Sequence, residues 1–465
     1  MKLHCRHLWK AGTWGALAVF LIAVSLPARS QDSQAPDLQQ LKNKLQQLDQ
    51  EMQELRGQIS RVEAQTALTT PAASKPGTAP AEQPPAEQKT NLDLYGFVML
   101  DSGYDFGQTD PQWFDVVRPT KLPSFDNQFG GNGNVYFGVR QTRFGVKTLT
   151  PTGWGDLKTQ FEFELFGTGV DAGQTTFRLR HAYGQLGHFG AGQTWSPFMD
   201  IDVFPNSLEY WGPNGMVFFR NVQIRWMPVL SDRTDLTFAL ERPGASADQG
   251  VYAGRIELLN VKPRFNLPDF SWHARFTRQW GYLQLAGIFR KIGWVDIKNQ
   301  QGLNLSGTAF GWGVNVTSNL KFGKKDTGRF AVVYGEGIEN YMNDAPVDIG
   351  IKNNFSNPVT PVKGTALPVL GVVSFLDHNW SERFSSAIGY SLVDIQNSNA
   401  QAPSDYHQGH YALTNLLYHP VPAVTIGGEF QFGRRINFSD GFNVNDYRMQ
   451  FSFKYDWRKA FGLSL

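Results

Sequence analysis

The alternation of apolar and polar residues between Gly155 and Gly187 is the pattern that most of the chain repeats. Phe161 and Phe163 fall on one parity, whereas Glu162 and Glu164 fall on the other. Because successive side chains of a strand point to opposite faces, this segment has one apolar face and one charged face. Lipid outside and water inside a barrel favour such a strand.

The second half of this segment shows the same alternation after a short Gly-rich break. Phe177, Leu179 and Tyr183 share the parity predicted to face lipid, and Arg178 and Arg180 share the other. The pattern indicates two neighbouring strands with charges directed inward.

The same reasoning predicts sixteen antiparallel strands, which together form an all-β transmembrane barrel. They are expected near 92–101, 135–148, 156–166, 174–186, 188–196, 216–227, 234–242, 270–279, 282–295, 307–318, 329–337, 366–376, 382–395, 408–418, 423–434 and 446–457. Long and short connections alternate between them, as in outer-membrane barrels. After residue 30, no apolar run approaches the ~18 residues that a membrane helix needs.

The first thirty residues have the pattern of a secretory signal peptide. A basic start precedes the short apolar run Ala11–Leu26, and a cleavage site follows before Gln31. A membrane anchor is the alternative. The only cysteine, Cys5, lies in this segment, so the mature chain is expected to hold no disulfide or thiolate metal site. Cleavage removes four of the 43 basic residues, leaving 39 against 41 acidic, which gives no support for nucleic-acid binding.

Residues 31–65 predict a coiled coil, and residues 66–90 a Pro- and Ala-rich linker. The heptad seam consists of Leu38, Leu41, Leu45, Leu48, Met52, Leu55, Ile59 and Val62. A single amphipathic helix packed on a domain is the alternative. The seam alone does not distinguish a dimer from a trimer.

The chain resembles the DcaP-like trimeric porins of the Gram-negative outer membrane. The resemblance is based on the heptad segment and linker before Leu92–Phe97, on Gln141–Thr148, and on Ala191–Asp200. It implies a barrel over residues 91–457 with a tail at 458–465. That tail is a departure, because such barrels often end on an aromatic residue, whereas here eight residues follow Trp457.

The resemblance also implies a function. It predicts an outer-membrane homotrimer in contact with outer-membrane lipid and lipopolysaccharide. The even strand count puts both ends of the barrel on the short-turn side, so the coiled coil is expected in the periplasm. Small anionic solutes such as dicarboxylates are expected to diffuse passively through its water-filled channel. The alternative is a barrel that acts mainly as a structural tether of the cell envelope.

A barrel of sixteen strands encloses an aqueous channel, so something must narrow it. The apolar third loop, residues 197–215, is the candidate, and folding inward would present Asp200, Asp202 or Glu209 to the pore. Packing over the barrel mouth or on a neighbouring subunit is the alternative.

Six arginines have the parity predicted to face the pore, and their positive charge is opposite to that of the acidic third loop. They are Arg143, Arg178, Arg180, Arg225, Arg275 and Arg448. One hypothesis is an arginine track that faces the acidic loop and binds carboxylates. The other is that these arginines pair with Glu162, Glu164 and Glu429 on adjacent strands and stiffen the wall.

An enzyme is not expected from this sequence. No serine lies in a nucleophile-elbow motif, and no His, Asp or Glu group has metal-ligand spacing. The histidines His181, His188 and His273 are isolated from one another. We therefore expect neither a cofactor nor a metal.

Overall fold

The computed structural model describes residues 89–167, 176–299 and 302–464. The chain divides into two units, Met1–Pro84 and Pro85–Leu465, and the description below concerns the second. The predicted signal peptide, the coiled-coil seam and the linker up to residue 88 lie outside the described residues. No helix of the described part is long and apolar enough to cross a bilayer.

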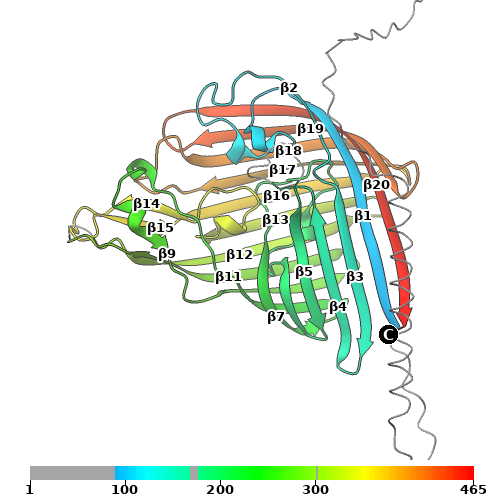
Figure 1. The fold of residues 1–465 in the computed structure, drawn as a ribbon. Coiled ribbons are helices and arrows are strands. Elements are labelled where there is room, and N and C mark those ends of the chain that lie inside the picture. Colours follow the sequence, from blue (N-terminus) through cyan, green and yellow to red (C-terminus); the bar gives the residue numbers. More distant parts are fainter. Residues whose placement is uncertain (1–88, 168–175, 300–301, 465) are drawn as a thin grey trace, which may run out of the picture. The chain divides into compact units, whose positions relative to one another are not determined.

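The second unit is a closed antiparallel barrel of sixteen strands (Figure 1). In order around the barrel they are β1 (Lys89–Asp105), β3 (Arg143–Thr152), β4 (Gly155–Glu164), β5 (Arg178–Leu186), β6 (Phe189–Trp195), β7 (Arg220–Leu230), β8 (Thr234–Glu241), β10 (Asp269–Arg278), β11 (Gly281–Asp296), β12 (Gly307–Phe322), β13 (Asp326–Glu336), β16 (Pro368–Asn379), β17 (Phe384–Ile395), β18 (Tyr406–Tyr418), β19 (Val424–Asn437) and β20 (Asn443–Ser464). Pairing of β20 with β1 closes the ring. The predicted strand count and fold are confirmed.

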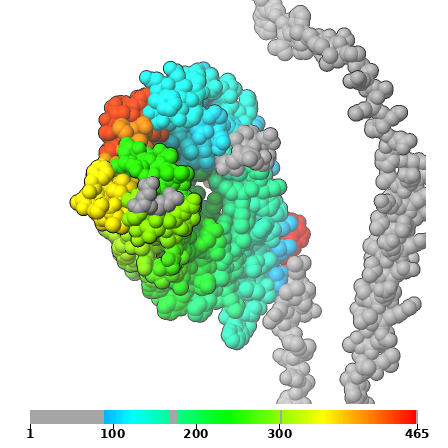
Figure 2. Space-filling view, turned by 60° about the vertical axis from the view of Figure 1, so that its left-hand side comes forward, coloured from blue at the N-terminus to red at the C-terminus, as the bar shows by residue number. Residues whose placement is uncertain are grey.

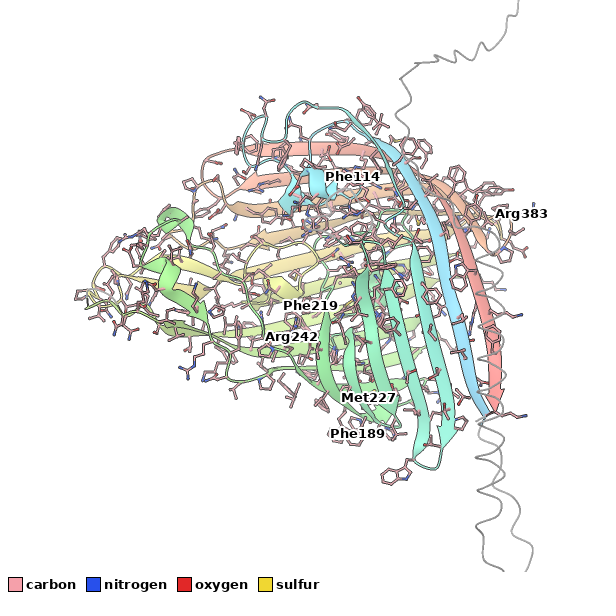
Figure 3. The ribbon with its side chains drawn as sticks, in the orientation of Figure 1. Phe114, Phe189, Phe219, Met227, Arg242 and Arg383 are labelled. Atoms are coloured by element: carbon pink, nitrogen blue, oxygen red, sulfur yellow. The ribbon has the colours of Figure 1, made fainter. Side chains whose placement is uncertain are left out.

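Short elements decorate the loops at one end of the barrel. They are β2 (Asn134–Gly138), β9 (Val261–Pro263), the hairpin β14 (Ile349–Asn353) and β15 (Val362–Ala366), and the 3-10 turns η1 (Pro111–Trp113), η2 (Pro119–Lys121), η3 (Ile201–Val203), η4 (Gly250–Tyr252), η5 (Leu258–Asn260) and η7 (Glu339–Tyr341). The strands join through short turns at the other end. Figure 3 labels Arg383 in one of these turns, between β16 and β17.

The two faces of the strands differ as the alternation predicts. On β12, Phe310 and Val314 are 62% and 40% exposed on the outside, whereas Asn315 and Thr317 on the inside are 1% exposed. The inner residues are buried because loops fold against them. The apolar core therefore lies inside the barrel, where Phe198 and other loop residues pack on the inner wall.

Three sequence expectations need correction. The segment 135–148 is not one strand, because the chain breaks between β2 and β3. Residues 458–464 of the predicted tail belong to β20, which runs to Ser464 because β1 begins early enough, at Lys89, to pair with it. Tyr183 lies opposite Gln160 and so faces inward, since a bulge in β5 beside Glu162 reverses the parity.

Candidate pore constriction

The third long loop, residues 196–219, which we call L3, folds into the barrel and follows its inner wall. Asn315 of β12 donates to the Phe198 carbonyl at 3.0 Å, and further along the loop Asn415 of β18 donates to the Asn206 carbonyl at 2.8 Å. Near its far end, the Tyr210 hydroxyl meets Arg180 of β5 at 3.0 Å. L3 therefore crosses much of the circumference.

Glycines of the wall let L3 and its neighbours approach the sheet closely. A Cβ on Gly313 would lie 2.8 Å from the Phe198 ring, and a Cβ on Gly371 would lie 2.2 Å from the Gly215 carbonyl oxygen. Larger side chains at these positions would displace the loop.

Glu429 and Glu209 anchor the middle of L3. The Glu429 carboxylate accepts the backbone N–H groups of Leu208, at 2.7 Å, and of Glu209, at 3.1 Å. The Glu209 carboxylate accepts the Val117 N–H at 3.1 Å and also the Gly212 N–H. Both acids are thus buried as acceptors for loop backbone, and neither pairs with an arginine as the sequence had suggested for Glu429.

Two further loops that the sequence did not indicate complete the narrow region. The first long loop, residues 106–142 (L1), contributes Arg118, whose guanidinium lies 4.2 Å from the Trp113 ring centroid and 4.1 Å from that of Trp211. The loop between β13 and β16, residues 337–367 (L6), holds Arg118 through Asp344 at 2.9 Å. L1, L3 and L6 are therefore tied together by one arginine.

Four arginines and two glutamates form a charged cluster on the inner wall, which L3 contacts through the Tyr210 hydroxyl. Glu164 pairs with Arg178 at 2.5 Å, with Arg180 at 2.6 Å and with Arg143 at 3.4 Å. Arg180 also pairs with Glu162 at 2.5 Å. Four guanidiniums, that of Arg220 included, thus surround two carboxylates.

Arg220 is the member of this cluster that sequence reasoning missed. It lies 3.9 Å from Glu164, and its Nη1 atom is buried with no hydrogen-bond partner among the described residues. It lies inside the predicted strand 216–227 but has the parity opposite to that of Arg225, so the alternation assigned it to the outer face. The cluster as a whole holds an excess of positive charge, which we call the arginine cluster (Arg143, Arg178, Arg180 and Arg220).

Two cavities adjoin the arginine cluster. One of about 480 Å³ lies between L3 and strands β1, β3, β4 and β5, and Arg143, Arg180 and His181 line it. Another of about 360 Å³ is lined by Arg118, Arg178, Arg220 and the Trp211 ring, among others. Phe218 lines both cavities. A small hollow is visible between the loops drawn in cyan and in green (Figure 2).

The remaining predicted basic residues have other surroundings. Arg275 pairs with Asp202 at 2.5 Å and with Asp200 at 3.5 Å, so one arginine does face acidic residues of L3. Arg448 is fully buried against Asp105 at 2.9 Å. Arg225 donates to the Trp195 carbonyl at 2.5 Å. Both hypotheses thus describe part of the wall: Arg275 meets the loop, and the arginine cluster meets neighbouring strands.

The acidic residues predicted at the constriction differ in exposure. The Asp202 side chain is 48% exposed, whereas that of Asp200 is 1% exposed because Tyr282 donates to it at 2.7 Å and Thr317 at 2.6 Å. Glu209 is 1% exposed. Only Asp202 of the three therefore presents a carboxylate to water.

Burial raises the pKa of two loop carboxyl groups, which favours their neutral form. Burial, with the nearby Glu429 charge, raises the pKa of Glu209 to about 8 despite the backbone N–H groups it accepts. Burial and the charge of Asp348 raise the pKa of Glu339 in L6 well above its ordinary value. Each of these residues lines one of the two cavities, so the loops add little negative charge there at neutral pH.

Within the described residues, no three His, Cys, Asp or Glu side chains gather as metal ligands. The predicted histidines have separate partners. His181 lies 2.9 Å from the Thr194 hydroxyl, His188 lies 2.7 Å from the Met227 carbonyl, and His273 lies 3.2 Å from Asp235. Figure 3 shows Met227 beside Phe189, near the short-turn end.

A closed sixteen-stranded barrel with an apolar exterior and a charged interior defines a transmembrane β-barrel protein. The chain belongs to the DcaP outer membrane protein family, whose profile matches residues 24–456. No curated protein sequence matches it.

Solved structures share the fold. The crystal structure of the outer membrane channel DcaP of Acinetobacter baumannii superposes with a TM-score of 0.66 at 20% identity, covering 79% of this chain and 97% of that one. The anion-selective porin from Comamonas acidovorans superposes with a TM-score of 0.50 at 10% identity, covering 79% of this chain and 100% of that one.

Proposed function

We propose that the protein is a channel for passive diffusion of small hydrophilic solutes, with a preference for organic anions and among them dicarboxylates. The observation that carries this proposal is the excess of guanidinium groups in the arginine cluster beside the 480 Å³ cavity. A guanidinium presents a planar fork of donors that matches a carboxylate. The proposal requires no cofactor, no energy source and no chemical step.

The solute path of this proposal passes through both cavities, first between L3 and the wall of β1, β3, β4 and β5, and then past Arg178 and Arg220. Arg143 and Arg180 face it from the wall, and Lys454 adds a further cation to the lining. Glu162 is the lining carboxylate of the wall, since the raised pKa of Glu209 keeps that loop residue largely neutral at pH 7. A passage with this lining attracts anions and repels cations of similar size.

The proposal extends to the assembly. We infer a homotrimer whose subunits are joined through the predicted heptad seam of residues 31–65, with the seam in the periplasm. Support comes from the unbroken apolar spacing and from the resemblance described above. The proposed trimer and the proposed charge preference depend on different observations, so an experiment can contradict one without contradicting the other.

Liposome swelling tests the charge preference. We expect proteoliposomes to swell faster in succinate than in an amine solute of similar size, and Arg178→Ala with Arg220→Ala to reduce the succinate rate severalfold. Arg278→Ala is the matched control, because Arg278 is exposed at the short-turn end and donates to the backbone carbonyls of Arg233 and Thr277. Equal rates for both solutes would contradict the anion preference, and no swelling at all would favour the structural tether.

A further inference from the structure

The outer surface of β7 to β12 carries a continuous row of aromatic side chains. Trp226, Phe238, Phe270, Phe289 and Phe310 follow one another across five adjacent strands, with ring centroids 5.9, 6.2, 6.5 and 6.1 Å apart. Trp226 and Phe289 are each 48% exposed, and Phe310 is 62% exposed. An exposed aromatic row of this extent fits hydrocarbon chains.

Basic residues lie directly beyond this row, toward the long loops. On β11, Lys291 is the next outward residue after Phe289 and lies opposite Phe310. On β8, Arg242 is the next outward position after Leu240, which is 52% exposed and lies opposite Phe270. The charged positions therefore begin one outward step beyond the aromatic row on β11 and two outward steps beyond it on β8.

A third basic residue, Arg264, lies between Arg242 and Lys291 around the barrel. The Arg264 N–H donates to the Gly293 carbonyl at 2.8 Å, which continues the register of β9 with β11. Gly293 has the parity of Lys291, so Arg264 faces outward as well. With strands about 4.8 Å apart, Arg242, Arg264 and Lys291 span a patch of about 10 Å, within reach of one phosphate-bearing head group.

None of these three cations forms an ion pair or a side-chain hydrogen bond within the described residues. The acids of the region are engaged elsewhere: Glu257 pairs with Arg255, Asp269 with Arg290, and Asp296 accepts backbone N–H groups. The patch is thus an uncompensated positive charge on the outer wall.

The height of the patch corresponds to a membrane boundary. Trp280, 47% exposed in the turn before β11, marks the opposite boundary. At ~3.3 Å per residue and a tilt of about 40°, Trp280 and Lys291 are separated by about 25–30 Å along the barrel axis, the thickness of the hydrocarbon layer. Long loops face the exterior in such barrels, so the patch lies at the head groups of the outer leaflet.

We propose that Arg242, Arg264 and Lys291, together with the aromatic row from Trp226 to Phe310, form a binding site for a phosphorylated glycolipid of the outer leaflet, namely the lipid A part of lipopolysaccharide. Its phosphates contact the three cations, and its acyl chains cover the aromatic row. This site is on the lipid face and is separate from the proposed solute path. It needs no channel activity.

Native mass spectrometry of the detergent-purified protein, titrated with bis-phosphorylated lipid A, tests the site. The triple variant Arg242→Gln, Arg264→Gln, Lys291→Gln is expected to bind about a hundredfold more weakly, since each basic residue near a lipid surface contributes about a factor of five. Arg383→Gln with Lys459→Gln removes two exposed cations at the short-turn end, and we expect it to bind like the wild type. Figure 3 shows Arg383 well separated from Arg242.

The outcomes separate the sources of the phosphate. Dephosphorylated lipid A and phosphatidylglycerol are expected to bind the wild type weakly and without difference from the triple variant. Unchanged binding of lipid A to the triple variant, or binding of phosphatidylglycerol as tight as that of lipid A, would overturn the proposal. Heat-dependent gel migration checks folding; if the triple variant fails to fold, the single variants replace it, each with an expected loss of about fivefold.

Discussion

The carboxyl group of Glu209 shows how burial decides what a single charge does in this lumen. The sequence suggested that this residue of L3 faces the pore. Its side chain is instead buried, and it accepts one N–H group from L1 and one from L3 itself. Its pKa is raised to about 8, so at neutral pH it stabilises loop contacts mainly as a neutral acid. Asp202 is the acidic residue of L3 that remains exposed.

The raised pKa predicts that L3 loosens as the pH rises. A carboxyl whose pKa increases on burial favours the closed loop fully below its ordinary value of 4.5, and this advantage is lost progressively up to about pH 8. Loop opening is therefore expected to increase by up to about tenfold per pH unit within that window. Hydrogen exchange of the Val117 and Gly212 amides, corrected for intrinsic rates, measures it.

Glu209→Gln mimics the neutral acid and should abolish this pH dependence. Glu257→Gln is the control, because the Glu257 carboxylate pairs with Arg255 at the surface and is remote from L3. Exchange that varies with pH equally in the wild type and in Glu209→Gln would show that another group controls the loop.

The strands were largely predictable from the sequence, and the loops were not. Alternation such as that of Phe310, Val314 and Asn315 locates a strand because a barrel wall has one wet face and one lipid face. The inward fold of L3 was predicted from its apolar residues. The contributions of Arg118 and Asp344 could not be, because their contact joins positions far apart in the chain and no local pattern encodes it.

Parity fails where the backbone departs from regular geometry. Tyr183 was assigned to the lipid face, yet the bulge in β5 turns it inward. Arg143, Arg178 and Arg180 were all assigned to the inner face, and they lie together there, although Arg180 is the extra residue of the bulge in β5. Arg220 was missed because its parity in the predicted strand 216–227 is opposite to that of Arg225, whereas β7 begins only at Arg220.

The segment 31–65 carries the prediction about assembly. Deleting residues 31–65 after the signal peptide is expected to shift the protein in detergent from trimer to monomer, because the heptad seam supplies the joining surface. Mass photometry in detergent measures the shift, and replacing Leu45 and Leu48 with Ala gives a milder variant. A deletion variant that remains trimeric would place the joining surface on the barrel instead.

The barrel brings together its outer surface, its inner wall and L3. Its outer surface is apolar, its inner wall is polar, and L3 fills part of the interior so that the remaining cavities adjoin the arginine cluster. In the proposed channel, the preference for anions follows from the charges that line these two cavities. A loop packed elsewhere would instead expose the wall carboxylate Glu429, which now accepts the backbone N–H groups of L3.

The reversal potential of the purified protein in a planar bilayer, recorded in a potassium chloride gradient, tests whether this lumen prefers anions. We predict a potential of the sign set by chloride, which moves toward zero in the Arg178→Ala, Arg220→Ala double variant while discrete conductance steps persist. A potential of the sign set by potassium, or one that the double variant leaves unchanged, would contradict the assignment of selectivity to the arginine cluster.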